Sequence, residues 1–216
     1  MRQVKPFVIT ISRQPGSGGA YLGRRLAARL KILYLDREIV YQAAKELEMS
    51  EQDLESRDEK LTPLWKSLLE SAAYIGFNPY VPPALDIHTD QELYAIESDI
   101  IKRTAQRHSV VIVGRGGSYV LCQHPRHLSV FLHADMAFRQ RLMQELNNIS
   151  EEEALKRIPS LDRERARYLH ALTGRDWTDA RQYHLSIDTG VIGLETAENI
   201  ILAAIHARFD DIELPR

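Results

Sequence analysis

The fold is decided by one stretch near the amino terminus, Phe7-Val8-Ile9-Thr10-Ile11-Ser12-Arg13-Gln14-Pro15-Gly16-Ser17-Gly18-Gly19-Ala20, and by the residues that follow it. Residues 7–11 are apolar or β-branched, which suits a buried strand. Turn-forming and small residues come next, and leucine then recurs at every fourth position, at Leu22, Leu26 and Leu30. The sequence therefore predicts a strand, a glycine loop and an amphipathic helix.

A helix that begins in a glycine loop can bind an anion. Its first backbone N–H groups lack acceptors within the helix, and this end of the helix dipole is positive. Residues 16–19 are therefore a candidate phosphate loop. Taken alone, the same residues are more typical of an ordinary strand–turn–helix corner, and the motifs that follow along the chain favour the phosphate loop instead.

The loop matches the P-loop pattern G-x-x-x-x-G-K-[ST] only in part. If Gly18 takes the last glycine of the pattern, Arg13 stands at the first glycine, Gly19 at the lysine and Ala20 at the hydroxyl residue. The lysine normally contacts the β- and γ-phosphates, and the hydroxyl holds magnesium. Candidates to replace them are Arg13, Arg24 or Arg25 for the charge and Ser12 or Ser17 for the hydroxyl.

Length and charge limit the function classes. A chain of 216 residues can bury a full core, so one domain with a small appendage is expected. With 27% charged residues and a net charge of −2, nothing indicates a general nucleic-acid or membrane binder.

The single cysteine, Cys122, excludes an internal disulfide, and we interpret it as a small apolar residue. No signal peptide or long apolar run is visible, so we expect a soluble cytoplasmic protein.

Two further strands end in polar residues. Residues 31–36 form a short strand that ends at Asp36, a carboxylate that could bind a ligand or cap the next helix. The apolar run 109–113 leads into Gly114-Arg115-Gly116, where glycines would let a phosphate approach and Arg115 could grip it. Both sites would lie at the same edge of a parallel sheet as the glycine loop.

The remaining periodicity predicts helices over 37–48, 91–108, 134–146 and 194–208, and strands over 127–133 and 183–188. In the helix 91–108, we expect Glu97 to face solvent. In the last helix, Ile200, Ile201, Ala204 and Ile205 are the candidates for the buried face. The proline-bearing stretch 76–90 has no clear period and is typical of a functional loop.

A helix follows Ser150, which is a candidate cap, and it leads into a stretch rich in arginine. Five arginines between residues 157 and 175 could lie on a solvated helix, or they could belong to a lid that closes over phosphates. Trp177 and Tyr183 then follow, and we expect them to anchor the return of the chain. The histidines show no metal-ligand spacing, and no G-x-S-x-G signature is present.

Read in order, these motifs resemble the cytidylate kinase-like family, a branch of the P-loop nucleoside monophosphate kinases. The likeness spans nearly the whole chain. It is carried by Ile9-Thr10-Ile11-Ser12-Arg13-Gln14, Gly16-Ser17-Gly18-Gly19, Tyr34-Leu35-Asp36-Arg37-Glu38, Val113-Gly114-Arg115-Gly116, Val130-Phe131-Leu132-His133-Ala134 with Arg139, Asp162-x-x-Arg165, and Trp177 to Thr189.

The resemblance implies a single P-loop NTPase-type domain over residues 1–216, with three α/β/α layers around a five-stranded parallel sheet. The core would comprise residues 1–48, 108–150 and 183–216. A helical NMP-binding insertion would span about residues 49–107, and an arginine-rich lid about residues 151–182. The implied reaction transfers the γ-phosphoryl group of ATP to CMP, dCMP or a related small acceptor, with Mg²⁺.

The same resemblance assigns roles to individual residues. Gly16, Ser17, Gly18 and Gly19 would bind the donor phosphates, and Asp36, Arg37 and Arg115 the acceptor. The catalytic set would comprise Arg13, Arg115, Arg139, Arg165 and Asp162, with Arg165 closing from the lid and Asp162 orienting it. Ser12 or Ser17 is the candidate metal-holding hydroxyl.

Two other functions remain open at this point. The chain could be a binding or regulatory protein that kept the fold and lost catalysis, a reading that the missing lysine favours. It could also phosphorylate a small molecule that is not a nucleotide. The expected partners are small-molecule nucleotides, with no nucleic acid and no membrane, and apolar helices in the insertion make a homodimer plausible.

Overall fold

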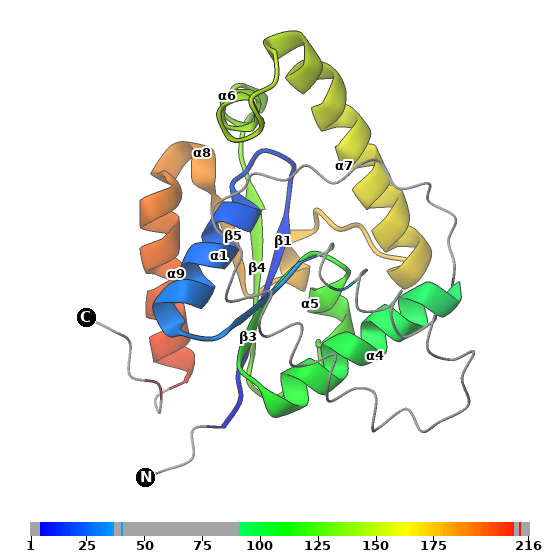
Figure 1. The fold of residues 1–216 in the computed structure, drawn as a ribbon, viewed down its shortest axis with the longest axis vertical. Coiled ribbons are helices and arrows are strands. Elements are labelled where there is room, and N and C mark those ends of the chain that lie inside the picture. Colours follow the sequence, from blue (N-terminus) through cyan, green and yellow to red (C-terminus); the bar gives the residue numbers. More distant parts are fainter. Residues whose placement is uncertain (1–4, 37–39, 41–90, 210–211, 213–216) are drawn as a thin grey trace.

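The computed structural model describes residues 5–36, 40, 91–209 and 212, which are coloured in Figure 1. In chain order the elements are β1 (Val8–Arg13), α1 (Gly19–Leu30), β2 (Leu33–Leu35), α4 (Gln91–Arg107), β3 (Val110–Val113), α5 (Gly117–Val120), β4 (His127–His133), α6 (Met136–Asn147), α7 (Glu151–Thr173), η1 (Ala180–Gln182), β5 (Leu185–Asp188), α8 (Thr189–Ile192) and α9 (Leu194–Arg208). The predictions for helix 37–48, for Arg37, for the loop 76–90 and for most of the insertion lie outside these residues.

The strands form one parallel sheet in the order β2-β3-β1-β4-β5. Helices α1 and α9 lie on one side of the sheet and α4 and α5 on the other, giving three layers (Figure 1). Because both faces of the sheet are covered, β3 is apolar along its whole length, and Val110–Val113 is fully buried. The predicted α/β fold with a five-stranded parallel sheet is confirmed.

The helices bury the faces that their periodicity indicates, with one exception. In α1, Leu22 and Leu26 are fully buried against the sheet. In α9, Ile201 and Ile205 are fully buried, but Ile200 is 39% exposed, so its prediction as a core residue was wrong. One helical step separates Ile200 from Ile201 and turns its side chain about 100° away from the sheet.

Cys122 was also interpreted wrongly. Its thiol is exposed, because the residue lies in the turn that follows α5 rather than in a strand or helix that packs on the core.

Two histidines lie at the opposite end of the sheet from the glycine loop. His127 is 2% exposed, and its Nε2 lies 2.7 Å from Thr10 Oγ1. His184 Nδ1 accepts from the Ser129 N–H at 2.9 Å, so this nitrogen carries no proton. Burial lowers the pKa of both imidazoles, and the pKa of His127 falls to about 4.

Acidification is therefore expected to destabilise the fold through His127. The unfolded chain binds a proton at the ordinary pKa of 6.5, whereas the folded chain binds one only near pH 4. Between these values the unfolded state holds more protons, so the free energy of unfolding should fall by about 3 kcal/mol as the pH drops. Urea titrations at a series of pH values should show this slope in the wild type and in His206→Gln, whose side chain is exposed, but lose it in His127→Gln.

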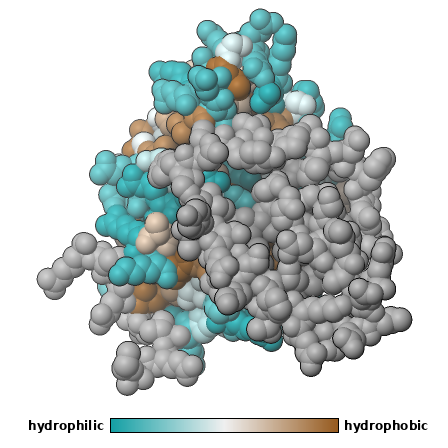
Figure 2. Space-filling view, in the orientation of Figure 1, coloured by the Kyte–Doolittle hydropathy of each residue, from teal (hydrophilic) through white to brown (hydrophobic). Residues whose placement is uncertain are grey.

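Large apolar side chains are exposed only at scattered points of the described surface. They are Tyr119, Met136, Leu155, Val191 and Ile200. Figure 2 shows small hydrophobic areas between hydrophilic residues on one face. None of the described helices has the length and hydrophobicity needed to span a membrane. The helices on which the homodimer expectation rested lie outside the described residues.

Candidate active site

The carboxyl ends of all five strands lie at one edge of the sheet, and the glycine loop follows β1 at its centre. From β1 the chain leaves towards β2 and β3 on one side, and it later returns to β4 and β5 on the other. Such a switch point is where open α/β sheets bind ligands. The sequence prediction that the loop, Asp36 and Gly114-Arg115-Gly116 share this edge is confirmed.

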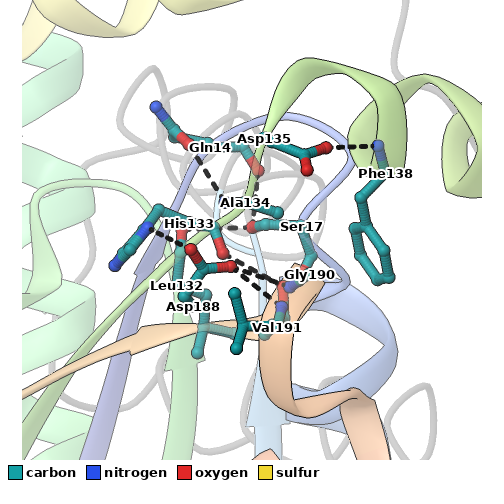
Figure 3. A network of polar contacts seen from close by, with 11 residues as sticks. Gln14, Ser17, Leu132, His133, Ala134, Asp135, Phe138, Asp188, Gly190 and Val191 are labelled. Carbon is teal, nitrogen blue, oxygen red and sulfur yellow. Dashed lines mark hydrogen bonds and ion pairs between the residues drawn. The ribbon is translucent and has the colours of Figure 1, made fainter.

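Hydrogen bonds fix the loop to the neighbouring strands, as Figure 3 shows. The Gln14 N–H donates to Leu132 O at 2.9 Å, and Ser17 Oγ donates to Gln14 O and Leu132 O at 2.8 and 3.1 Å. From the end of β5, the buried Thr189 hydroxyl donates to the main-chain oxygens of Ser17 and His133. The loop is therefore held in shape without a ligand.

Gly16 allows the loop to lie against α6. Its φ is +79°, a conformation that favours glycine, and a Cβ at this position would collide with the main-chain oxygen of Arg139. Helix α1 then begins after Gly18, which has no side chain to cap it. The first amides of α1 therefore remain available to an anion from outside the helix.

Helix α7 presents three residues, spaced three apart, to the site: Asp162, Arg165 and Tyr168. Arg165 Nη1 donates to the main-chain oxygen of Arg13 at 2.7 Å. Asp162 Oδ2 accepts from Arg139 Nη1 at 2.8 Å, and the Tyr168 ring lies 4.9 Å from Arg115 Cζ. One face of α7 thus contacts three of the predicted site arginines: Arg13, Arg115 and Arg139.

Other residues of α7 behave as a solvated helix. Ser150 caps it, as predicted, by accepting from the Glu153 N–H, and Lys156 pairs with Glu152.

Beyond the helix, Tyr183 Oη donates to Trp177 O at 2.7 Å, and both rings pack on Phe131. The prediction that Trp177 and Tyr183 anchor the returning chain is confirmed.

Arg139 lies beside the loop and is 5% exposed. Its pair with Asp162 leaves Arg139 Nε and Asp162 Oδ1 buried without a hydrogen-bond partner among the described residues. A buried donor without a partner costs about 1–3 kcal/mol, so such groups usually await a ligand or a water molecule. A phosphate oxygen would satisfy the Arg139 N–H.

Arg115 is fixed from two sides. It has a φ of +52° between Gly114 and Gly116, which are also left-handed. Glu97, 1% exposed, accepts from Arg115 Nε at 3.0 Å and from its Nη2, while Tyr168 packs against the guanidinium. The guanidinium is therefore positioned before any ligand binds.

The prediction that Glu97 faces solvent was wrong. In helices most glutamates face solvent, but here the buried carboxylate is balanced by Arg115, 18 residues away in the sequence.

Tyr168 and Thr189 are further site residues to which the sequence analysis gave no role. Only the spacing of Tyr168 from Asp162 and Arg165 could have indicated that Tyr168 lies at the site.

Replacing Glu97 with glutamine should loosen Arg115 and weaken the binding of phosphate at this turn about tenfold, because the neutral amide holds the guanidinium more weakly. Calorimetry with inorganic phosphate would measure this effect. Asp99→Asn is the matched control, because Asp99 lies on the same helix, is exposed and pairs with Arg103. Equal phosphate affinities for the two variants would contradict the positioning role of Glu97.

The structure also separates the candidates for the missing positive charge. Arg25 pairs with the buried Glu198 on α9, and Arg24 contacts Asp36 at 3.5 Å. Of the three, only Arg13 runs along the glycine loop, where its side chain contacts Gly19.

Asp36 lies in a defined polar setting. It accepts from Tyr34 Oη at 3.1 Å, and its main-chain oxygen accepts from the Val40 N–H. Burial and the nearby carboxylate raise the pKa of Tyr34, so its phenol stays protonated and donates. Asp36 thus combines a carboxylate at the site edge with a main-chain hydrogen bond to Val40.

The part of the chain that the structure describes includes no group of three or more His, Cys, Asp or Glu side chains that could hold a metal. Near the loop, Asp162 is paired with Arg139, and Asp135 caps α6. Of the two candidate hydroxyls, Ser17 Oγ bonds to main-chain oxygens within the loop, and Ser12 Oγ lies 3.4 Å from Ser118 Oγ.

Comparison with known proteins agrees with this geometry. The model of the cytidylate kinase-like family matches residues 8–191. An uncharacterized protein from Eubacterium ventriosum ATCC 27560 shares the fold with a TM-score of 0.70 at 22% identity, covering 94% of this chain and 99% of that one.

More distant similarities involve shikimate kinases. The enzyme from Bacteroides thetaiotaomicron has a TM-score of 0.48 at 13% identity, over 93% of this chain and 98% of that one. The enzyme from Acinetobacter baumannii, solved with shikimate, has a TM-score of 0.47 at 15% identity, over 97% and 96%. No curated protein sequence matches the chain.

Proposed function

We propose that this chain, which belongs to the cytidylate kinase-like family, is a phosphotransferase that moves the γ-phosphoryl group of ATP to a small acceptor already carrying a phosphate. The observation that carries the proposal is the preformed glycine loop at the switch point of the sheet. Arg13 of β1 and Arg139 of α6 lie against this loop, and Arg165 of α7 donates to the main-chain oxygen of Arg13. CMP and dCMP are the first acceptors to test, since the family is named for cytidylate kinases.

The donor would bind with its phosphates on the amides of residues 16–19. Phosphoryl transfer needs positioning and charge neutralisation rather than a covalent bond to the protein. Arg139 and Arg165 would supply positive charge, and the contact of Arg165 with the loop suggests that α7 acts as a lid. A closed lid would exclude water and so limit hydrolysis of ATP.

The acceptor would lie on the β3 side of the loop. Arg115, oriented by Glu97 and Tyr168, would hold its phosphate with two hydrogen bonds. Asp36 would contact the rest of the acceptor from the end of β2. This arrangement would place the acceptor phosphate in line with the bound donor.

Magnesium would enter with ATP, because this ion usually keeps several water ligands and binds phosphate oxygens. When bound, it would neutralise charge on the donor phosphates. Ser12 is the hydroxyl proposed to contact its shell, since Ser17 Oγ holds the loop together.

The test is a ³¹P-monitored assay with ATP, Mg²⁺ and a panel of acceptors. The panel should include the common nucleoside monophosphates and small phosphorylated or hydroxylated metabolites. The expected result is ADP formation that depends on one acceptor class, with CMP or dCMP the leading candidates. If no acceptor supports ADP formation, phosphotransfer is not the function.

A second candidate is a nucleotide-binding protein without catalysis. The observation that favours it is the pair Gly19 and Ala20, which stand where a P-loop has its lysine and hydroxyl. This alternative predicts that calorimetry detects ATP binding while the ³¹P assay detects no transfer. Turnover of a non-nucleotide acceptor would instead favour the third function, a kinase of another small molecule, in which the insertion would form a different acceptor site.

A further inference from the structure

The side chain of Arg13 crosses the amino-terminal end of α1. A Cβ built on Gly19 would lie 2.8 Å from Arg13 Cβ and 2.6 Å from its Cγ. Farther along, a Cβ on Gly114 would collide with Arg13 Nη1, and Arg13 Cζ would be 3.0 Å from it. Arg13 therefore leaves β1, passes over the first residue of α1 and places its guanidinium at the β3–α5 turn.

This path explains why glycine stands at position 19. Heavy-atom contacts below about 3 Å are strongly repulsive, so residues 13 and 19 cannot both carry side chains in this geometry. In the P-loop pattern, position 13 would be glycine and position 19 lysine. Here the two are exchanged, with the cation at position 13 and the glycine at position 19.

We infer that Arg13 replaces the P-loop lysine, bringing a guanidinium to the β- and γ-phosphates of the donor from the opposite wall of the loop. The inference rests on the proposed function and deepens it. In the proposed phosphoryl transfer, no covalent bond to Arg13 forms or breaks. The guanidinium donates hydrogen bonds to phosphate oxygens and stabilises the charge that develops during transfer.

Two contacts support this placement of Arg13. Arg165 Nη1 donates to the main-chain oxygen of Arg13, so α7 meets the loop at the same residue. The guanidinium also lies next to Gly114, which immediately precedes Arg115. A cation there would stand between the donor site at the loop and the acceptor site at Arg115, where charge builds up during transfer.

The first experiment compares Arg13→Ala, Arg13→Lys and the control Arg29→Ala, an exposed arginine of α1 whose guanidinium lies 3.6 Å from Glu198. Arg13→Ala should lower kcat roughly 10²- to 10³-fold and weaken ADP binding at least tenfold in calorimetry. Arg13→Lys should recover part of both losses, and Arg29→Ala should change neither. If Arg13→Ala binds ADP and turns over like the wild type, the inference is wrong.

The second experiment moves the positive charge from position 13 to position 19, where the P-loop pattern has its lysine. Gly19→Lys alone should impair ADP binding, because the new side chain meets Arg13. The triple variant Arg13→Gly, Gly19→Lys, Ala20→Thr completes the P-loop pattern and should bind ADP at least tenfold more tightly than Arg13→Gly alone. A triple variant that binds no better than Arg13→Gly, or a Gly19→Lys variant that binds like the wild type, would overturn the inference.

The readouts keep the two proposals distinguishable. ADP affinity reports on Arg13 even if no acceptor in the panel is phosphorylated, so failure of transfer alone leaves the test of Arg13 intact. Conversely, wild-type turnover with an unaffected Arg13→Ala variant would support the phosphotransferase and reject the role of Arg13. A wild type that binds neither ATP nor ADP would overturn both.

Discussion

Replacing Arg115 with alanine is expected to lower kcat/KM for the acceptor roughly 10²- to 10³-fold while leaving the affinity for ATP within a factor of three. The side chain is held by Glu97 and Tyr168 on the β3 side of the glycine loop, where the proposed acceptor phosphate lies. Removing it takes away the hydrogen bonds proposed to orient the acceptor, whereas the loop amides proposed to hold ATP are untouched. Initial rates at varied acceptor concentration, with calorimetry for ATP, measure both quantities.

Two comparisons sharpen this expectation. Arg103→Ala removes a partly exposed arginine of α4 that pairs with Asp99, and it should leave both constants unchanged. Adding Glu97→Ala to Arg115→Ala should cause little further loss, because Glu97 acts through Arg115. An equal loss of ATP affinity and acceptor affinity in Arg115→Ala would show that this arginine does not belong to a separate acceptor site.

Replacing Gly16 with alanine is expected to lower the free energy of unfolding by about 3 kcal/mol or more and to abolish ADP binding. Its left-handed conformation accounts for about 1–2 kcal/mol of that loss. The rest comes from the collision of the new Cβ with the main-chain oxygen of Arg139. This oxygen cannot move freely, because the Arg139 N–H bonds to Asp135 O and its guanidinium to Asp162.

Gly174 provides the matched control for Gly16. It also has a positive φ, of +66°, but a Cβ there would meet nothing within 4 Å. Gly174→Ala should therefore cost only about 1–2 kcal/mol and leave ADP binding intact. Chemical denaturation of the two variants gives the comparison, and an equal loss of stability would mean that contact with α6 does not constrain the loop.

The sequence was sufficient to predict the fold, because apolar residues recur with a characteristic period in strands and in helices. The apolar runs at residues 7–11 and 109–113 and the leucines of α1 specify buried strands and a helix packed on them. The shared edge of the sheet followed from parallel strands alone. Strand 127–133 and helix 194–208 have the bounds that the sequence predicted.

The site was less accessible to sequence reasoning because its contacts join distant parts of the chain. Nothing local distinguishes the buried Glu97 from an exposed helical glutamate, since its partner Arg115 belongs to another element. Likewise, the loop pattern left Arg13, Arg24 and Arg25 all open as sources of the missing charge, although only Arg13 was placed in the expected catalytic set. Only the path of Arg13 over Gly19, and the pairing of the other two with Asp36 and Glu198, separates them.

The central claim is that the main-chain amides at the start of α1 bind the phosphates of the donor. The most direct measurement is a ¹H–¹⁵N titration of the wild-type protein with a non-hydrolysable ATP analogue and Mg²⁺, followed at the glycine amides. The account predicts large shifts of the Gly18 and Gly19 resonances that saturate with the binding curve. Saturated binding with these two resonances unmoved would contradict it.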